Sequence, residues 1–126
     1  MAARGVFIAG TDTGVGKTLV ACALLRGLAA TSLRVVGMKP VAAGATRRRG
    51  VWHNEDVVQL QAAGNVDAPQ AWVNPYCFAT PIAPHIAARD CGTTIRMTPI
   101  ARCYAQLARR ADVIVVEGVG GLVVPL

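Results

Sequence analysis

Lysine is scarce in this chain, although the chain as a whole is basic. The 126 residues carry a formal net charge of +6, but their 13 basic side chains include only two lysines, Lys17 and Lys39. Arginine therefore supplies the general surface charge. A lysine ammonium is a compact cation that enters tight phosphate-binding loops, whereas the arginine guanidinium is a planar fork. Lys17, which stands in a Gly-Lys-Thr sequence, is accordingly the first candidate for a specific role.

Long apolar runs and paired cysteines are also missing. No apolar run approaches the roughly 20 residues of a membrane span, so we expect no membrane partner. The 4 cysteines include no Cys-x-x-Cys pair, and His53 and His85 are not spaced with them as zinc ligands. Cys22 and Cys103 fall in apolar helical patterns, which predicts buried free thiols and fits a reducing cytoplasm.

Aromatic residues are few, and the basic residues form no long block. A hydrophobic fraction of 53% with 5% aromatic residues is typical of one packed α/β domain, here residues 1–126. The longest basic run, Arg47–Arg49, is flanked by glycines, which predicts a solvated loop tip. We therefore expect no nucleic-acid partner.

A glycine-rich segment, Gly10–Thr18, carries the strongest functional signal. It follows the apolar run Val6–Ala9 and opens into an apolar helical pattern, which is the order of a nucleoside-triphosphate phosphate cradle. Backbone N–H groups would hold phosphate oxygens, Lys17 would add a cation and the Thr18 hydroxyl would bind Mg²⁺. Five residues separate Gly10 from Gly16, so the segment is one residue longer than the common Gly-x-x-x-x-Gly-Lys-Ser/Thr pattern.

Strand and helix patterns alternate along the chain, which predicts an α/β fold of the P-loop NTPase kind with three layers and a mainly parallel sheet. Asn54 and Thr98 are expected helix caps, with Gly64 after the first helix and Pro99 at the first position of the second. Residues 40–49 and 65–80 are expected to be loop or irregular. The predicted strands are 5–9, 34–38 and 112–117, and the predicted helices are 17–30, 55–63, 84–90 and 99–110.

Acidic residues offer a possible metal site. Glu117 ends the apolar run Val113–Val116, where Walker-type sites place a carboxylate for Mg²⁺. Asp56 on local pattern alone is better explained as an acid in the first turn of a helix. Lys39 precedes Pro40 at the end of a predicted strand, where open α/β sheets bind ligands, although a lone lysine there also suits a plain surface position.

The order of these pieces resembles the dethiobiotin synthetase family. The resemblance covers essentially the whole chain but only a little over the N-terminal half of that family's length. The long phosphate loop and the Lys-Pro segment are specific when they occur together. The segments that carry the resemblance are Gly10–Thr18, Lys39–Gly44, Asn54–Asp56, Asn74–Tyr76, Pro84–His85 and Val116–Gly121.

The resemblance implies a cytoplasmic, homodimeric enzyme that uses ATP and Mg²⁺. It would join CO₂ to 7,8-diaminononanoate and close the ring of dethiobiotin through a phosphorylated carbamate. Lys17 and Lys39 would be catalytic, and Thr18, Asp56 and Glu117 would hold Mg²⁺. Ala43 stands where the family commonly has a hydroxyl that contacts substrate. The implied ATP-binding residues are Thr13, Gly14, Val15, Gly16, Lys17, Thr18, Leu19, Asp56, Glu117, Gly118, Val119 and Gly120.

Other interpretations stay open. Partition-type ATPases carry a lysine early in the loop where this chain has Asp12, which argues against them, and cobyrinate synthases share the fold but are much longer. The chain ends in the apolar run Leu122–Leu126 without a cap or polar tail, which predicts that the domain is cut short. An inactive remnant that at most binds nucleotide is therefore the alternative from a different class.

Overall fold

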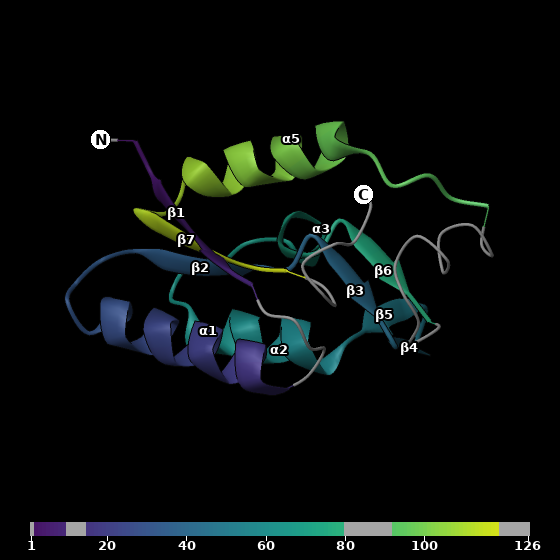
Figure 1. Ribbon diagram of the computed structural model, residues 1–126, viewed down its shortest axis with the longest axis horizontal. Helices are drawn as coiled ribbons and strands as arrows, with labels where there is room; N and C mark the ends of the chain where they lie inside the picture. The colour runs from purple at the N-terminus through teal and green to yellow at the C-terminus, as the bar shows by residue number, and fades with distance from the viewer. Residues whose placement is uncertain (1, 10–14, 80–91, 119–126) are drawn as a thin grey trace.

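The computed structural model describes residues 2–9, 15–79 and 92–118, and its elements form three layers (Figure 1). A parallel sheet lies in the middle, with helix α5 (Met97–Ala108) on one face and helices α1 (Val15–Ala29) and α2 (Glu55–Ala63) on the other. The sheet has the strand order β1-β7-β2. This arrangement confirms the predicted three-layer α/β fold with a parallel sheet.

Strand β7 (Val113–Glu117) is central because its side chains are apolar on both faces. It pairs in parallel with β1 (Arg4–Ile8) and with β2 (Val35–Met38), so its backbone donors and acceptors are used on both edges. A continuous β-branched run of this kind is typical of a strand covered by helices on both sides. The three strands lie within a residue or two of their predicted positions.

Side chains alternate between two hydrophobic clusters, one on each face of the sheet. Val113 and Val115 pack with α1 and α2, whereas Ile114 packs in the cluster that contains α5 residues. Since successive strand residues point to opposite faces, Glu117 shares the face of Val113 and Val115. The last residue of β7 is thereby directed toward α1 and α2.

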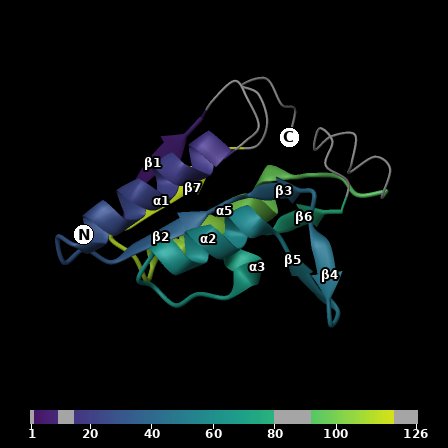
Figure 2. The same ribbon diagram turned by 90° about the horizontal axis from the view of Figure 1, so that it is seen from below.

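Helix α2 begins where the sequence predicts. Asn54 Oδ1 accepts a hydrogen bond from the Val57 N–H at 3.2 Å, and Glu55 and Asp56 occupy the first turn. The cap satisfies one of the free N–H groups at the helix start, and the acidic residues suit its positive dipole end. Figure 2, seen from below, shows α1 and α2 side by side across the sheet.

Two predicted irregular regions contain regular structure. Strand β3 (Val41–Ala43) pairs in parallel with β6 (Tyr76–Phe78), and the short helix α3 (Gln70–Val73) precedes β6. Three-residue strands and a single helical turn are too short to give a readable period in sequence. The expectation of irregular chain over 65–80 was therefore wrong.

The arginine run lies in a hairpin, not in a loop. Strand β4 (Thr46–Arg48) pairs antiparallel with β5 (Val51–His53), and Arg47 stacks over the ring of Trp52 with 4.7 Å between Cζ and the ring centroid. The turn between them has positive φ at Arg49 (53°) and Gly50 (79°). Positive φ at both central residues matches the right-handed twist of a two-residue hairpin. The predicted exposure of the run is confirmed.

The start of α5 also differs from expectation. Arg96, not Thr98, is the N-cap, and its side chain makes no capping hydrogen bond. Pro99 remains in the first turn, where a missing N–H costs nothing. The Arg96 N–H instead donates to the hydroxyl of Tyr76 at 3.1 Å. The predicted helix at 84–90 lies outside the described residues.

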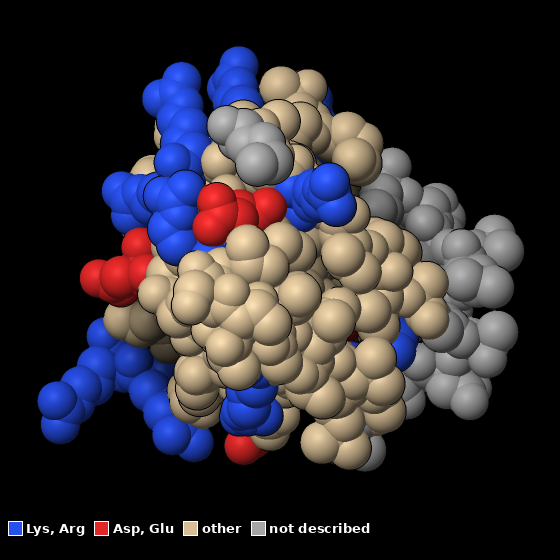
Figure 3. Space-filling model, turned by 90° about the vertical axis from the view of Figure 1, so that its left-hand side faces the viewer, with Lys and Arg blue, Asp and Glu red and all other residues tan. Residues whose placement is uncertain are grey.

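The surface charge is unevenly placed on the face drawn in Figure 3. Basic side chains lie mainly along the left side of this view, in an upper and a lower group with acidic side chains beside them, while uncharged residues fill the middle. Within the described ranges, no helix combines the length and the apolar character needed to cross a bilayer.

Candidate functional site

Four polar side chains meet at the carboxyl edge of the central sheet. Thr18 Oγ1 donates a hydrogen bond to Glu117 Oε1 at 2.8 Å. Lys39 Nζ lies 2.9 Å from Asp56 Oδ2 and 3.3 Å from the same Glu117 Oε1. The four residues come from α1, α2, β7 and the residue after β2, so widely separated parts of the sequence form one connected cluster.

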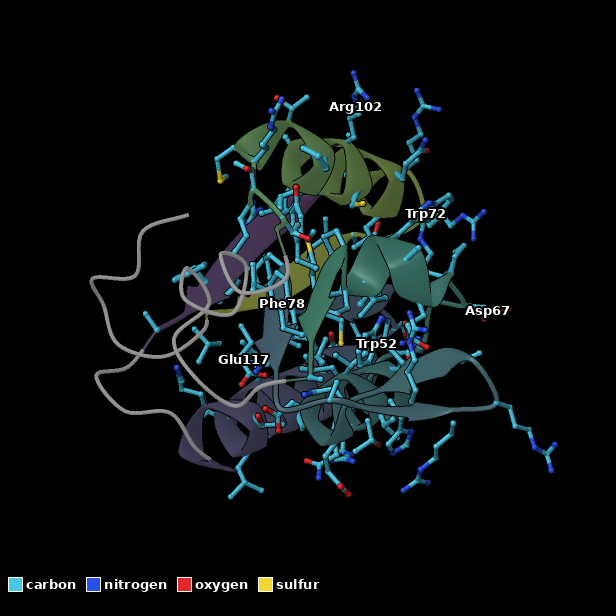
Figure 4. The ribbon with its side chains drawn as sticks, turned by 90° about the vertical axis from the view of Figure 1, so that its right-hand side faces the viewer. Trp52, Asp67, Trp72, Phe78, Arg102 and Glu117 are labelled. Atoms are coloured by element: carbon cyan, nitrogen blue, oxygen red, sulfur yellow. The ribbon has the colours of Figure 1, made fainter. Side chains whose placement is uncertain are left out.

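The fold explains why these residues converge. Lys39 directly follows β2 and is an even number of residues from Val35, so both side chains lie on the same face of the sheet, the face that packs on α1 and α2. Glu117 of β7 lies on this face as well. Thr18 lies in the first turn of α1 and Asp56 in the first turn of α2. The carboxyl ends of parallel strands are where open α/β sheets bind ligands. Figure 4 faces this edge and shows Glu117 between the strands and α1.

The cluster is buried and has an excess of negative charge. Glu117 and Thr18 are each 1% exposed and Lys39 is 7% exposed, while the Asp56 side chain is 32% exposed. One lysine faces two carboxylates, which leaves a formal charge of −1. Buried charges are tolerated when they are paired and hydrogen-bonded. Solvent reaches the cluster at Asp56.

The two carboxylate oxygens of Glu117 differ in their hydrogen bonding. Its Oε1 accepts from both Thr18 and Lys39, whereas Oε2 is buried and has no hydrogen-bond partner among the described residues. Buried polar atoms without a partner are uncommon. The hydroxyl of Thr18 and the carboxylates of Asp56 and Glu117 are oxygen donors of the kind that Mg²⁺ prefers. These donors fit a divalent cation, although no three His, Cys, Asp or Glu side chains gather anywhere in the described ranges.

Two asparagines support the site in a way that the sequence did not reveal. Asn74 Nδ2 donates to the carbonyl oxygens of Lys39 at 2.7 Å and Tyr76 at 2.9 Å, and the Lys39 N–H donates to Val73 O at 2.8 Å. Both backbone polar groups of Lys39 are thus fixed by the chain at the end of α3. The sequence predicted a turn at Asn74–Tyr76, but it did not indicate that Asn74 would bind the backbone of Lys39.

Asn54 has a second role besides capping α2. Its Nδ2 donates to the carbonyl oxygen of Ala43 at 3.3 Å, so the start of α2 is tied to β3. Asp56 lies two residues after this cap. Asn54 thereby fixes the first turn of α2, which carries Asp56, relative to strand β3.

Cys22 lies on the buried side of α1, close to the cluster. Burial raises the pKa of its thiol, the Arg26 guanidinium lowers this pKa, and the carboxylates of Glu117 and Asp56 raise it. A thiol with a raised pKa is protonated and unreactive at neutral pH. Cys22 is accordingly a packing residue, as predicted, whereas Cys103 is only half-buried.

Several predicted site residues lie elsewhere or outside the described ranges. Thr13, Gly14, Val119 and Gly120 are outside them. Val15 begins α1, Gly16 and Leu19 are exposed near its start, and Lys17 is half-buried. The Gly118 N–H donates to the carbonyl oxygen of Ile8 at 3.0 Å, which continues the sheet beyond Glu117.

A cavity of about 500 Å³ lies apart from this cluster, between the β4–β5 hairpin, α3 and β6. Trp52, Tyr76 and Phe78 are among its lining residues, and none of the four clustered side chains lines it. Figure 4 labels Trp52 and Phe78 on this part of the molecule. The charged cluster and this cavity are therefore separate features.

Comparison with known proteins places these observations in a family. A family profile described as an AAA domain matches residues 4–126. The chain is 51% identical over 123 residues to the ATP-dependent dethiobiotin synthetase BioD of Aromatoleum aromaticum, covering 98% of this chain and 55% of that protein. The proteins of the same name from Nitrosospira multiformis and Xanthomonas oryzae pv. oryzae are 50% and 49% identical over 123 and 120 residues, with 53% and 54% of their lengths covered. The chain thus spans about half the length of the curated relatives it matches.

Proposed function

Since the chain belongs to the AAA domain family, whose profile matches residues 4–126, we propose that it is the phosphate- and metal-handling part of an ATP-dependent dethiobiotin synthetase. The observation that carries the proposal is the buried cluster of Thr18, Lys39, Asp56 and Glu117 beside the Gly-Lys-Thr start of α1. Relatives of that name match this chain at about half identity.

The proposed reaction needs no nucleophile from the protein. One amine of 7,8-diaminononanoate adds to CO₂ and loses a proton, which gives a carbamate. A carbamate oxygen attacks the γ-phosphorus of ATP, and ADP leaves. The second amine then attacks the carbamoyl carbon and expels phosphate, which closes the cyclic urea of dethiobiotin. Catalysis therefore consists of positioning the reactants and neutralising their charge.

The two lysines suit this requirement. A carbamate and a triphosphate are both anionic, and unit charges about 4 Å apart interact by about 4 kcal/mol at an effective dielectric constant of about 20. Lys17 lies within the glycine-rich segment and would hold phosphate oxygens. Lys39 lies at the edge of the sheet and would neutralise the carbamate and the transferred phosphoryl group.

Thr18, Asp56 and Glu117 would hold Mg²⁺, which supplies charge neutralisation at the phosphates. The buried, unpartnered Glu117 Oε2 supports this assignment, because it leaves an anionic donor without a hydrogen bond. Thr18 lies at the start of α1, where helix N–H groups also favour anionic phosphate.

The remaining residues refine the proposal. Ala43 lacks the hydroxyl that the family commonly offers to substrate, and the loss of one neutral hydrogen bond costs about 0.5–1.5 kcal/mol. Because the chain covers about half of its relatives, we propose turnover and a homodimeric state for the protein of full family length. Nucleotide binding is the function that we propose for the 126 residues themselves.

The test is a phosphate-release assay with full-length protein, Mg-ATP, bicarbonate and 7,8-diaminononanoate, with dethiobiotin measured by mass spectrometry. We expect phosphate and dethiobiotin in equal amounts. Omission of the diamine is the matched control and should abolish both products. A monoamine of the same length can form a carbamate but has no second amine to close the ring, so it should give no cyclic urea. Phosphate release that is independent of the diamine would refute the proposal.

A further inference from the structure

Lys39 stands where the proposed divalent cation is needed. Its ammonium lies 2.9 Å from Asp56 Oδ2 and 3.3 Å from Glu117 Oε1, so it bridges the two carboxylates that would bind the metal. Glu117 Oε1 already accepts the hydroxyl of Thr18 as well. The Lys39 ammonium therefore occupies the position between the Asp56 and Glu117 carboxylates.

The charges make a cation necessary at this position. Without Lys39, two carboxylates, one of them 1% exposed, would face each other with no positive charge between them. Leaving a buried charge without its partner is strongly unfavourable. A divalent cation and the ammonium would compete for the same oxygens, and the divalent ion carries the greater charge.

The ammonium of Lys39 can leave without a change of the backbone. The Lys39 backbone is fixed by Val73 and Asn74, whereas its side chain is a flexible stem with a strongly hydrated head. The Asp56 side chain is 32% exposed, so a hydrated ion can approach the pair from that side. Exchange of one cation for the other therefore needs only side-chain rotation.

We propose that Lys39 is an internal cation that occupies the Asp56–Glu117 pair until a divalent ion enters and displaces its ammonium. The displaced ammonium then becomes available to an anionic ligand at the same edge of the sheet. The exchange itself follows from the contacts of Lys39, whereas the delivery of Lys39 to substrate rests on the proposed function. Metal loading and the availability of Lys39 are thus coupled in one step.

The first test measures Mn²⁺ binding by electron paramagnetic resonance, with the 126-residue chain and no nucleotide. Lys39→Met removes the competing charge and should bind Mn²⁺ about tenfold more tightly, within the usual range for coupled binding events. Arg34→Met is the matched control, because it removes the cation of the exposed Arg34–Asp112 pair at the opposite end of the strands. The control should bind Mn²⁺ as the unmodified chain does. Equal or weaker binding by folded Lys39→Met would overturn the proposal.

The second test uses the unmodified chain and does not depend on the folding of a variant. Since the sequence contains only Lys17 and Lys39, acetylation of each lysine can be followed by mass spectrometry without ambiguity. Mn²⁺ should increase the acetylation rate of Lys39 severalfold relative to Lys17. A Lys39 rate that stays constant or falls at saturating Mn²⁺ would show that the ammonium keeps its place, and the proposal would be wrong.

Failure of the proposed function gives a different result. A full-length protein that forms no dethiobiotin but exposes Lys39 on adding Mn²⁺ would refute the assigned reaction and leave the exchange intact. An active enzyme in which Mn²⁺ does not change the acetylation rate of Lys39 would refute the exchange and leave the assigned reaction intact.

Discussion

Thr18 and Glu117 are 99 residues apart in sequence, yet Thr18 Oγ1 donates to Glu117 Oε1 at 2.8 Å. The bond joins the first turn of α1 to the end of the central strand. Both side chains are buried, so neither can exchange this contact for water. The contact therefore ties the start of α1 to the central sheet.

We expect Thr18→Val to lower the free energy of unfolding by about 1–3 kcal/mol, because a buried acceptor loses its donor while the side-chain shape is kept. Urea denaturation monitored by circular dichroism measures this change. Thr18→Ser retains the hydroxyl and is the matched control. Identical urea midpoints for the valine and serine variants would contradict the prediction.

Lys39→Gln should separate binding from turnover. If Lys39 acts on the transferred group, kcat of the full-length enzyme should fall on the order of 10²–10³-fold, as for loss of one charge-stabilising donor, while the KM for ATP changes little. Steady-state kinetics give both constants. An equal loss of ATP affinity and turnover would identify Lys39 as a simple binding residue.

Much of this architecture follows from the sequence in physical terms. The β-branched run before Glu117 predicts a strand buried on both faces, and its period of two directs Glu117 to the same side as Val113 and Val115. Asn54 and the acids that follow predict the start of α2 at the observed residue. Long periodic elements and strong caps are therefore readable from local pattern alone.

The remainder depends on contacts that local pattern does not encode. Strands β3 and β6 are short and exist because they pair with each other across more than thirty residues of chain, with Val41 opposite Tyr76. The bond from Asn74 to the Lys39 carbonyl is likewise set by tertiary packing. The bridge from Lys39 to Asp56 and Glu117 appears only once β2, α2 and β7 are placed together.

Asn74→Ala should loosen Lys39 as well as destabilise the chain. Loss of the donor to two carbonyl groups should reduce the free energy of unfolding by about 1–3 kcal/mol and raise the acetylation rate of Lys39 without Mn²⁺. Asn65→Ala is the matched control, because Asn65 also makes two backbone hydrogen bonds, to Val35 N and Leu33 O. The control should lose stability and leave Lys39 reactivity unchanged. The same increase in both variants would mean that Asn74 has only a structural role.

The ion pair between Arg34 and Asp112 should give the chain a defined acid dependence. The Arg34 guanidinium, together with the Arg34 N–H at 2.9 Å, lowers the pKa of Asp112 from its ordinary value of 3.8. A group with a lowered pKa in the folded state stabilises that state above its unfolded pKa and loses this contribution as the pH falls through the folded pKa. The stabilisation by Asp112 should therefore be complete near neutral pH and disappear on acidification.

We expect the Tm of the unmodified chain to exceed that of Asp112→Asn by a constant amount above about pH 5 and by a shrinking amount below about pH 4. Both groups face solvent, so about 1 M salt should reduce the difference at neutral pH. Differential scanning calorimetry of both proteins across this range measures the effect. Arg34→Met, which keeps the backbone donor, should retain part of the acid dependence. A Tm difference that persists undiminished at about pH 2 would show that Asp112 stabilises the fold without its charge.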